Sequence, residues 1–428
     1  MTRLLSLIIT LICAAATCGA EPLTLEHCLE RARENYPKIS DYGLTDNLTE
    51  LNLSEINRGW LPRLELYAQG TAQNVVPAFP DVLRNMLAQN GFDLKGMSKL
   101  QYKAGAELQQ TIWDGGASKA ARLTERASNA ASRAALDVEL YSVRSQVESL
   151  YFGILLMQEQ MRQTLSTITL LEADHRRIES MVANGTAMQS DADMVEARTL
   201  TLRQNLAQAQ TAIEGYYEAL SVYVGEDVGG RELICPSAEM PAETTPARPE
   251  LTLFDKRLEQ NRARESAIKA TVMPRVGFFA QAYYGYPGYN YFESMTNRAL
   301  SFNALAGVKV SWTLESLYTR GIARKKLQLD SRLIDTDREL FLFNTRLLTA
   351  HQRAAIDGMR KVMDDDARIV ELMGRVRHAA ESQLENGVID ATALLSKIND
   401  ENQARLNSLY HKILLVQNIY QLKNTLNR

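Results

Sequence analysis

Residues 103–116 read KAGAELQQTIWDGG, and residues 117–182 follow them in an unbroken helical pattern that ends at Asn184-Gly185. The first segment alternates apolar and polar side chains, as a strand with one buried face does. Asp114-Gly115-Gly116 indicates a turn between this strand and the helix. The stretch therefore predicts a strand, a turn, a very long helix and a second turn, and the rest of the chain is arranged around it.

The same unit occurs twice. Gly105 corresponds to Gly307, which lies in LAGVKVSWTL, 202 positions later. Gly185 and Gly387 are separated by the same 202 positions. Two further landmarks recur 212 positions apart, centred on Pro62 and Pro274 and on Pro37 and Pro249. Because the landmarks keep their order and nearly constant spacing, they indicate an internal duplication and not a chance similarity between helix-rich segments.

The start of the chain predicts export. Arg3 provides a positive start, residues 4–16 an apolar core, and Cys18-Gly19-Ala20 a cleavage site of small residues, so residues 1–20 resemble a signal peptide. A lipoprotein acylated on Cys18 is the alternative. The mature chain then divides into a first repeat (residues 21–228), a connector rich in Pro, Ala, Glu and Thr (residues 229–247) and a second repeat (residues 248–428).

Composition limits the class of protein. The 428 residues include only 23 Gly and 11 Pro, which favours long helices, and the net charge of −3 argues against nucleic-acid binding. No later apolar run is long enough for a transmembrane helix. Export would place Cys28 and Cys235 in an oxidising compartment, so a disulfide between them is possible, although nothing in their positions requires it.

Four segments of about ten residues alternate with a period of two; they are residues 64–71, 102–109, 276–284 and 302–313. This length suits a tilted membrane-spanning strand, and tyrosine and tryptophan residues at the ends suit the membrane interface. A charge facing lipid would cost about 2–4 kcal/mol. Lys103, Glu107 and Lys309 are therefore expected to face inward. Four strands cannot close a barrel, so the chain must form oligomers if these strands span a membrane.

The long helices carry apolar residues three and four positions apart, as in a coiled coil. In the first repeat these are Val143, Val147, Leu150, Ile154, Met157 and Met161. The returning helices are expected to begin at Ser190-Asp191 and at Asp390 or Thr392. A helix over residues 117–182 would be roughly 100 Å long, which does not suit a compact globular domain.

The sequence contains no pattern typical of a catalytic site or of a metal or phosphate site. The five histidines are scattered, and no motif for a nucleophile, a metal or a phosphate is present. The run Asp364-Asp365-Asp366 is expected to be a solvated helix face, or to face a lumen in a tube. We predict no enzymatic activity and no cofactor.

Taken in order, several segments resemble the TolC family of outer-membrane efflux proteins over essentially all of the mature chain. They are LTLEHCLERARENYP (23–37), WLPRLELYAQG (60–70), IWDGG (112–116), ANGTAMQSDADMVEAR (183–198), AGVKVSWTL (306–314) and ENGVIDATALL (385–395). The resemblance implies a mixed α and transmembrane β fold in a homotrimer. Its twelve-stranded β-barrel, four strands per chain, would lie in outer-membrane lipid and continue into a long α-helical coiled-coil tunnel in the periplasm.

The resemblance also implies a function. Such proteins are passive exit ducts of tripartite efflux or type I secretion systems, which receive substrates from an inner-membrane pump of RND or ABC type through a periplasmic adaptor. The turns that meet the adaptor in this family correspond to Asn184, Gly185, Thr186, Asn386, Gly387 and Val388. The same glycines also supply the positive φ of a tight turn.

The family resemblance implies a closed aperture held by an aspartate six residues after the first turn glycine. Asp191 occupies that position, but Ile389 and Leu384 replace its arginine and tyrosine partners. The aperture candidates are Asp191, Asp193 and Asp390. A soluble periplasmic coiled-coil adaptor or scaffold is the alternative function, but it would leave the apolar faces of four strands unburied. The sequence does not indicate which substrate is transported or which class of pump delivers it.

Overall fold

The computed structural model describes residues 22–91, 96–237, 239–243 and 245–428. The predicted signal peptide and Cys18 lie outside the described residues. The chain divides into two compact units, which we describe separately. The helical unit is formed by the described residues up to Tyr42, by Arg133–Leu253 and by Asp337–Arg428, and the sheet unit by Gly43–Ser132 and Phe254–Thr336.

A long helical hairpin follows a pair of strands in each half of the chain. After α2 (Leu25–Asn35) and η1 (Pro37–Ser40), the first half contains α3 (Asp41–Arg58), β1 (Arg63–Ala72), α4 (Asp81–Gln89), β2 (Leu100–Trp113), α5 (Ala117–Ala183) and α6 (Gln189–Val224). The second half contains α7 (Pro249–Thr271), β3 (Arg275–Tyr286), α8 (Tyr291–Thr296), β4 (Ser301–Ser311), α9 (Glu315–Glu385) and α10 (Ala391–Leu426). No helix in the described part of the chain has the length and apolar character needed to cross a membrane.

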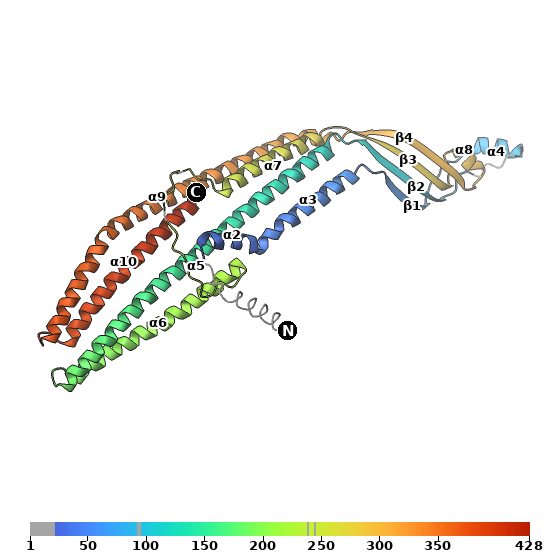
Figure 1. The fold of residues 1–428 in the computed structure, drawn as a ribbon. Helices are drawn as coiled ribbons and strands as arrows, with labels where there is room; N and C mark the ends of the chain where they lie inside the picture. The colour runs from blue at the N-terminus through green and yellow to red at the C-terminus, as the bar shows by residue number, and fades with distance from the viewer. Residues whose placement is uncertain (1–21, 92–95, 238, 244) are drawn as a thin grey trace, which may run out of the picture. The chain divides into compact units, whose positions relative to one another are not determined.

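The sheet unit contains one antiparallel sheet with the strand order β1-β2-β3-β4 (Figure 1). The four predicted strands are confirmed, and β2 is longer than expected, with an irregularity between Thr111 and Trp113. The connection between β1 and β2, which the sequence suggests to be a loop, contains α4. Its apolar residues Val82, Leu83, Met86 and Leu87 recur at helical spacing, a signal that the expectation of a loop overlooked.

The core of the helical unit lies between the long helices and α2. The predicted apolar stripe of α5 is confirmed: Val143, Val147 and Ile154 are buried, and the other members of the stripe pack against the same cluster. A second cluster joins the hairpin of α5 and α6 to the hairpin of α9 and α10 near their turns (Figure 1). It includes Ile178, Val195, Leu384 and Leu394, one from each helix.

The starts of the returning helices differ from each other. Asp390 caps α10 as predicted, because its Oδ1 accepts the Ala393 N–H at 2.8 Å. The predicted cap of α6 at Ser190-Asp191 is wrong by two or three residues. Met188 is the residue at the cap, and Asp191 accepts the Met188 N–H at 3.0 Å from the first turn. A carboxylate in the first turn can bond back to the cap residue, so Asp191 stabilises this helix start without being its cap.

The acidic run Asp364-Asp365-Asp366 is only partly exposed to solvent. Asp366 is buried and lies 2.9 Å from His411 Nδ1, so the acidic run is not wholly a solvated face, although Asp364 and Asp365 are exposed. The helical period explains this, since the third carboxylate faces α10 while the first two do not.

The two cysteines of the described chain are not joined. Cys28 is buried, Cys235 is exposed, and the structure contains no disulfide between them.

Candidate channel wall and hairpin tips

The sheet has one apolar face and one polar face. Residues that pair directly across strands point to the same face. Leu66 pairs with Ala106, which pairs with Ala282 and through it with Ala304, and this row is apolar. The adjacent row is Glu65, Glu107, Gln281 and Leu305, on the opposite face. Large side chains of the apolar face are exposed, among them Leu64, Leu66, Phe302, Val308 and Val310.

The polar face carries the charged residues that the alternation places there. Lys103, Glu107 and Lys309 all lie on it, as expected. The ammonium group of Lys103 lies 5.8 Å from the ring centroid of Tyr67 and 5.3 Å from that of Tyr283. Both distances suit cation–π attraction. The polar face is therefore an ordered surface of charged, amide and phenol groups, and it can line an aqueous passage.

Gly105 allows the strands to pack at this face. A Cβ atom at Gly105 would lie 2.3 Å from the carbonyl oxygen of Ala282 and 2.6 Å from Tyr283 Cβ. Tyr67 and Tyr283 pair with Gly105 on its two sides. The missing side chain therefore gives room to the tyrosines, and any larger residue would force the sheet apart.

The two hairpin tips have the same turn geometry. Gly185 and Gly387 adopt φ values of +68° and +70°. At the first tip, the N–H of Thr186 donates to Met181 at 2.8 Å and the N–H of Gly185 to Val182 at 3.0 Å. At the second, Val388 donates to Gln383 and Gly387 to Leu384 at the same two distances. Both turns are thus Schellman motifs, which satisfy the last carbonyl groups of α5 and α9.

The residues predicted to contact an adaptor are exposed at these tips. All six, Asn184, Gly185, Thr186, Asn386, Gly387 and Val388, are accessible to solvent. Val388 is 70% exposed, and Met188, which sequence reasoning did not single out, is 73% exposed. Apolar side chains with this exposure at both tips make a surface that a protein partner can cover.

The three aperture candidates make local hydrogen bonds. Asp191 and Asp390 accept backbone N–H groups of their own helix starts, and Asp193 Oδ1 accepts Gln189 Nε2 at 2.9 Å. One polar contact between the hairpins comes from residues that the sequence pattern did not indicate. Arg177 of α5 lies 2.7 Å from Glu385 of α9.

A buried polar network lies farther from the tips. Glu401 of α10 is buried, forms an ion pair with Arg377 of α9, and lies 2.7 Å from Arg405 Nη2. Nearby, Asn402 Oδ1 accepts Thr167 Oγ1 of α5 at 2.8 Å. The i,i+4 spacing of Glu401 and Arg405 was visible in the sequence, but the contact with Arg377 depends on how the hairpin folds. No group of residues suited to hold a metal ion occurs among the described residues.

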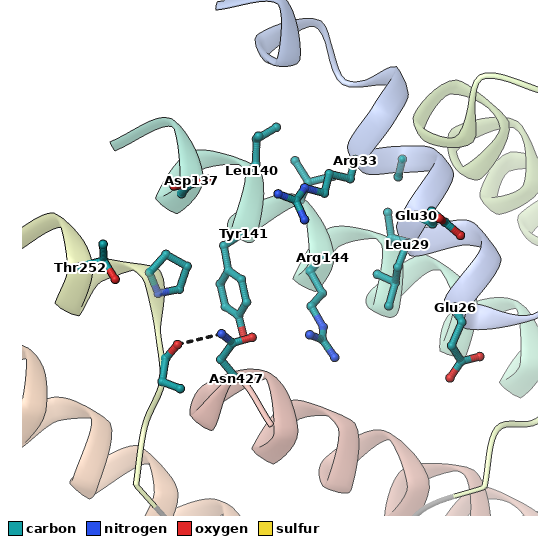
Figure 2. A pocket seen from close by; sticks show the side chains of 15 residues that line it. Glu26, Leu29, Glu30, Arg33, Asp137, Leu140, Tyr141, Arg144, Thr252 and Asn427 are labelled. Carbon is teal, nitrogen blue, oxygen red and sulfur yellow. Dashed lines mark hydrogen bonds between the residues drawn. The ribbon is translucent and has the colours of Figure 1, made fainter. Parts of the chain in front are cut away.

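A cavity in the helical unit has a volume of about 650 Å³ and lies between α2, α5 and the start of α7 (Figure 2). Tyr141 O–H donates to the carbonyl oxygen of Asn424 at 2.5 Å, and Asn427 Nδ2 donates to that of Ala247 at 2.8 Å. The cavity wall contains carboxylates and guanidinium groups together, including Glu30. Its mixed charge does not select an ionic ligand.

Comparison with solved structures identifies the fold. The outer-membrane protein VceC from Vibrio cholerae matches with a TM-score of 0.67 at 13% sequence identity, over 94% of this chain and 95% of that chain. The open state of the MtrE outer-membrane channel from Neisseria gonorrhoeae matches with a TM-score of 0.65 at 15% identity, over 94% and 88%. This is the fold of the TolC family.

The CmeC outer-membrane channel from Campylobacter jejuni has the TolC fold as well, with a TM-score of 0.65 at 13% identity, over 94% of this chain and 85% of that chain. No family model matches the sequence. No curated protein matches it either. The resemblance to the TolC family that the ordered segments of the sequence indicated is therefore confirmed by the fold, although the sequence identities to these solved structures are low.

Proposed function

We propose that this protein is an outer-membrane channel through which an export assembly releases its substrates. The two-faced sheet carries the proposal. An exposed apolar face suits lipid, and a polar face with Lys103, Glu107 and Lys309 suits a water-filled lumen. The similarity to solved outer-membrane channels supports the same conclusion.

The active form that we propose is a homotrimer. Within one chain, β1 and β4 are the outer strands of the sheet, and open strand edges are unfavourable in lipid. Three copies would close a barrel of about twelve strands. Exposed apolar residues on the helices also favour contact with further copies. On α3 these are Leu44, Leu48 and Leu51, and on α9 they include Ile322, Leu329, Leu333, Leu340 and Leu347.

The long hairpins would then form a periplasmic tunnel. In this proposal the two repeats each contribute one hairpin, and the exposed turns at Gly185 and Gly387 contact a periplasmic adaptor that delivers substrates from an inner-membrane pump. A tripartite efflux pump and a type I secretion system would both use such a duct.

Asp191, Asp193 and Asp390 near the tips are proposed to line the aperture. If Asp191 holds it closed, Asp191→Ala should raise the single-channel conductance, and an unchanged conductance would remove Asp191 from the gate.

The test is the state of the protein extracted from outer membranes in mild detergent. Light scattering corrected for bound detergent should give three chains per particle, and planar bilayers should record ion-conducting channels. A protein that stays in solution without detergent and forms no channels would contradict the proposal. The soluble periplasmic scaffold would then be the better assignment.

A further inference from the structure

We propose that the loop between β3 and β4 narrows the outer mouth of the channel and limits the size of the solutes that leave it. The loop comprises residues 287–300 and contains α8 (Figure 1). The inference rests on the proposed function, because it takes the polar face of the sheet as the wall of the lumen.

Burial reveals which face of the sheet the loop covers. At the loop end of the sheet, Tyr283 and Asn303 lie on the polar face and are 5% and 8% exposed. Tyr284 and Phe302, their neighbours along the strands, lie on the apolar face and are 56% and 71% exposed. If the loop were unfolded or pointed away from the sheet, the side chains of both faces would be exposed to solvent at this end. The start of the loop therefore folds over the polar face and leaves Tyr284 and Phe302 exposed, whereas Tyr286, which the alternation places on the apolar face, is 2% exposed.

Tyr289 makes the main contacts between the loop and the polar face. Its N–H donates to Asn303 Oδ1 at 2.7 Å, and its ring meets the ring of Tyr283 edge to face at 5.2 Å. Its hydroxyl donates to Gln281 Oε1 at 3.3 Å. Gln281 lies two residues farther from the loop than Tyr283 on the same face, so Tyr289 extends along the wall instead of staying at its rim.

Gly288 brings the backbone of the loop into direct contact with the same face. A Cβ atom at this position would lie 2.3 Å from Ser301 Oγ and 2.9 Å from Asn303 Oδ1. The Gly288 N–H also donates to Ser294 Oγ of α8 at 3.1 Å, and Ser294 O accepts the Tyr286 hydroxyl at 3.0 Å. These bonds tie α8 to the end of β3, and the contacts of Gly288 and Tyr289 hold the start of the loop over the polar face.

A trimer would place three such loops around one lumen. Each would add a layer of backbone and the Tyr289 side chain to the inner side of the wall at the same height, and the opening left between the three loops would set an upper size for solutes. The constriction lies near the outer surface, so a solute would pass any aperture at the hairpin tips first and the constriction afterwards.

The test measures access to a thiol below the loop in intact cells. Gln109→Cys places the thiol on the polar face, two rows from Tyr283 on the side away from the loop. Cells are treated with a small charged maleimide or with a maleimide on a long poly(ethylene glycol) chain. The loop is left unchanged, opened by Tyr289→Ala, or altered only in its hydroxyl by Tyr289→Phe. The chain with only its native cysteines measures background labelling, and Phe292→Cys, on the exposed part of α8, is the control for reagent access.

With the unchanged loop, the small reagent should label Gln109→Cys and the polymer should not. Tyr289→Ala should allow the polymer to react, and Tyr289→Phe should resemble the unchanged loop more closely because it keeps the ring contact. The constriction would be contradicted if the polymer labelled Gln109→Cys at the same rate with the unchanged loop and with Tyr289→Ala. If neither reagent labels Phe292→Cys on intact cells, the loops do not face outward, and the proposed function falls together with the constriction.

Discussion

Arg177 Nη2 of α5 lies 2.7 Å from Glu385 Oε1 of α9, and the same guanidinium donates to the carbonyl oxygen of Glu381 at 3.1 Å. This arginine joins the helix that leads to the first tip with the helix that leads to the second. Both helices take part in the apolar cluster near the turns. Separation of the hairpins would break the polar contact and expose part of that cluster, so the arrangement resists opening at the tips.

Arg177→Ala should weaken this link and raise the mean single-channel conductance of the protein in planar bilayers. Ionic contacts of partly exposed groups are individually modest, so we expect a shift toward open events and not a permanently open channel. Arg176→Ala, at the exposed neighbouring position, is the matched control and should leave the conductance unchanged. Equal conductance in both variants would mean that Arg177 does not restrain the tips.

Glu401→Ala should destabilise the hairpin of α9 and α10 by about 2 kcal/mol, because it removes one of the two carboxylate partners of the largely buried Arg377 and leaves only Glu381. The thermal midpoint followed by circular dichroism should fall clearly. Glu371→Gln, which removes an exposed ion pair 2.8 Å long from α9, should change the midpoint little. If both variants melt at the same temperature as the unmodified protein, the buried network contributes no net stability.

The Glu401 carboxyl should also make the hairpin sensitive to acid. Burial alone would raise its pKa, but the hydrogen bonds and charges of Arg405 and Arg377 outweigh burial and lower the pKa below its usual value. A lowered pKa in the folded state means that this stability is complete above the pKa of the unfolded chain and is lost as the pH falls through the folded pKa. Acid titration of the thermal midpoint should show this loss in the unmodified protein and not in Glu401→Gln.

Glu148 should have the opposite pH dependence. Burial raises the pKa of its carboxyl to about 7, and the hydrogen bond and charge of Arg144 only partly oppose this shift. Stability linked to Glu148 is then complete below the ordinary pKa of glutamate and decreases as the pH rises toward 7, by up to about 3 kcal/mol. Glu148→Gln should melt higher than the unmodified protein at pH above 7 and similarly in acid. Glu139→Gln, at an exposed position of α5, should show no such difference.

Gly105→Val should prevent the sheet from forming, since the added Cβ would lie 2.3 Å from the backbone oxygen of Ala282. The amount of folded protein in the membrane should fall to a small fraction, as measured by its mobility in gels before and after heating. Gly70→Ala is the control, because no atom lies within 4 Å of a Cβ placed at Gly70. Normal folding of Gly105→Val would show that the strands adjust at this point.

Val388→Asp and Met188→Asp should each reduce binding of a periplasmic adaptor without loss of folded protein. Both side chains are exposed at the tips, so a carboxylate there causes no strain but places charge in an apolar contact. Copurification of the proposed adaptor with this protein measures the effect. Gln383→Asp, an exposed position on α9 before the turn, is the control. Unchanged copurification would separate the tips from adaptor binding.

The elements that repeat with a local period could be predicted from the sequence. The alternation of residues 302–313 identified β4 and the face to which Phe302 and Val308 belong, and the apolar stripe from Val143 identified the buried side of α5. Asp390 was recognised as a cap because capping joins residues three positions apart. In each case the relevant partners lie within a few residues or follow from a simple geometric period.

Contacts between distant segments were decided only by the tertiary structure. Nothing local indicates that Arg377 pairs with Glu401, that Arg177 reaches Glu385, or that Asp366 is turned away from solvent. The position of Tyr289 over Tyr283 likewise depends on how a loop without a period folds back onto a finished sheet. Local periods and turn residues were enough to predict which faces are apolar and where the turns lie. Packing determined which of the polar residues meet, because their partners are brought together only when separate helices and strands have settled against one another.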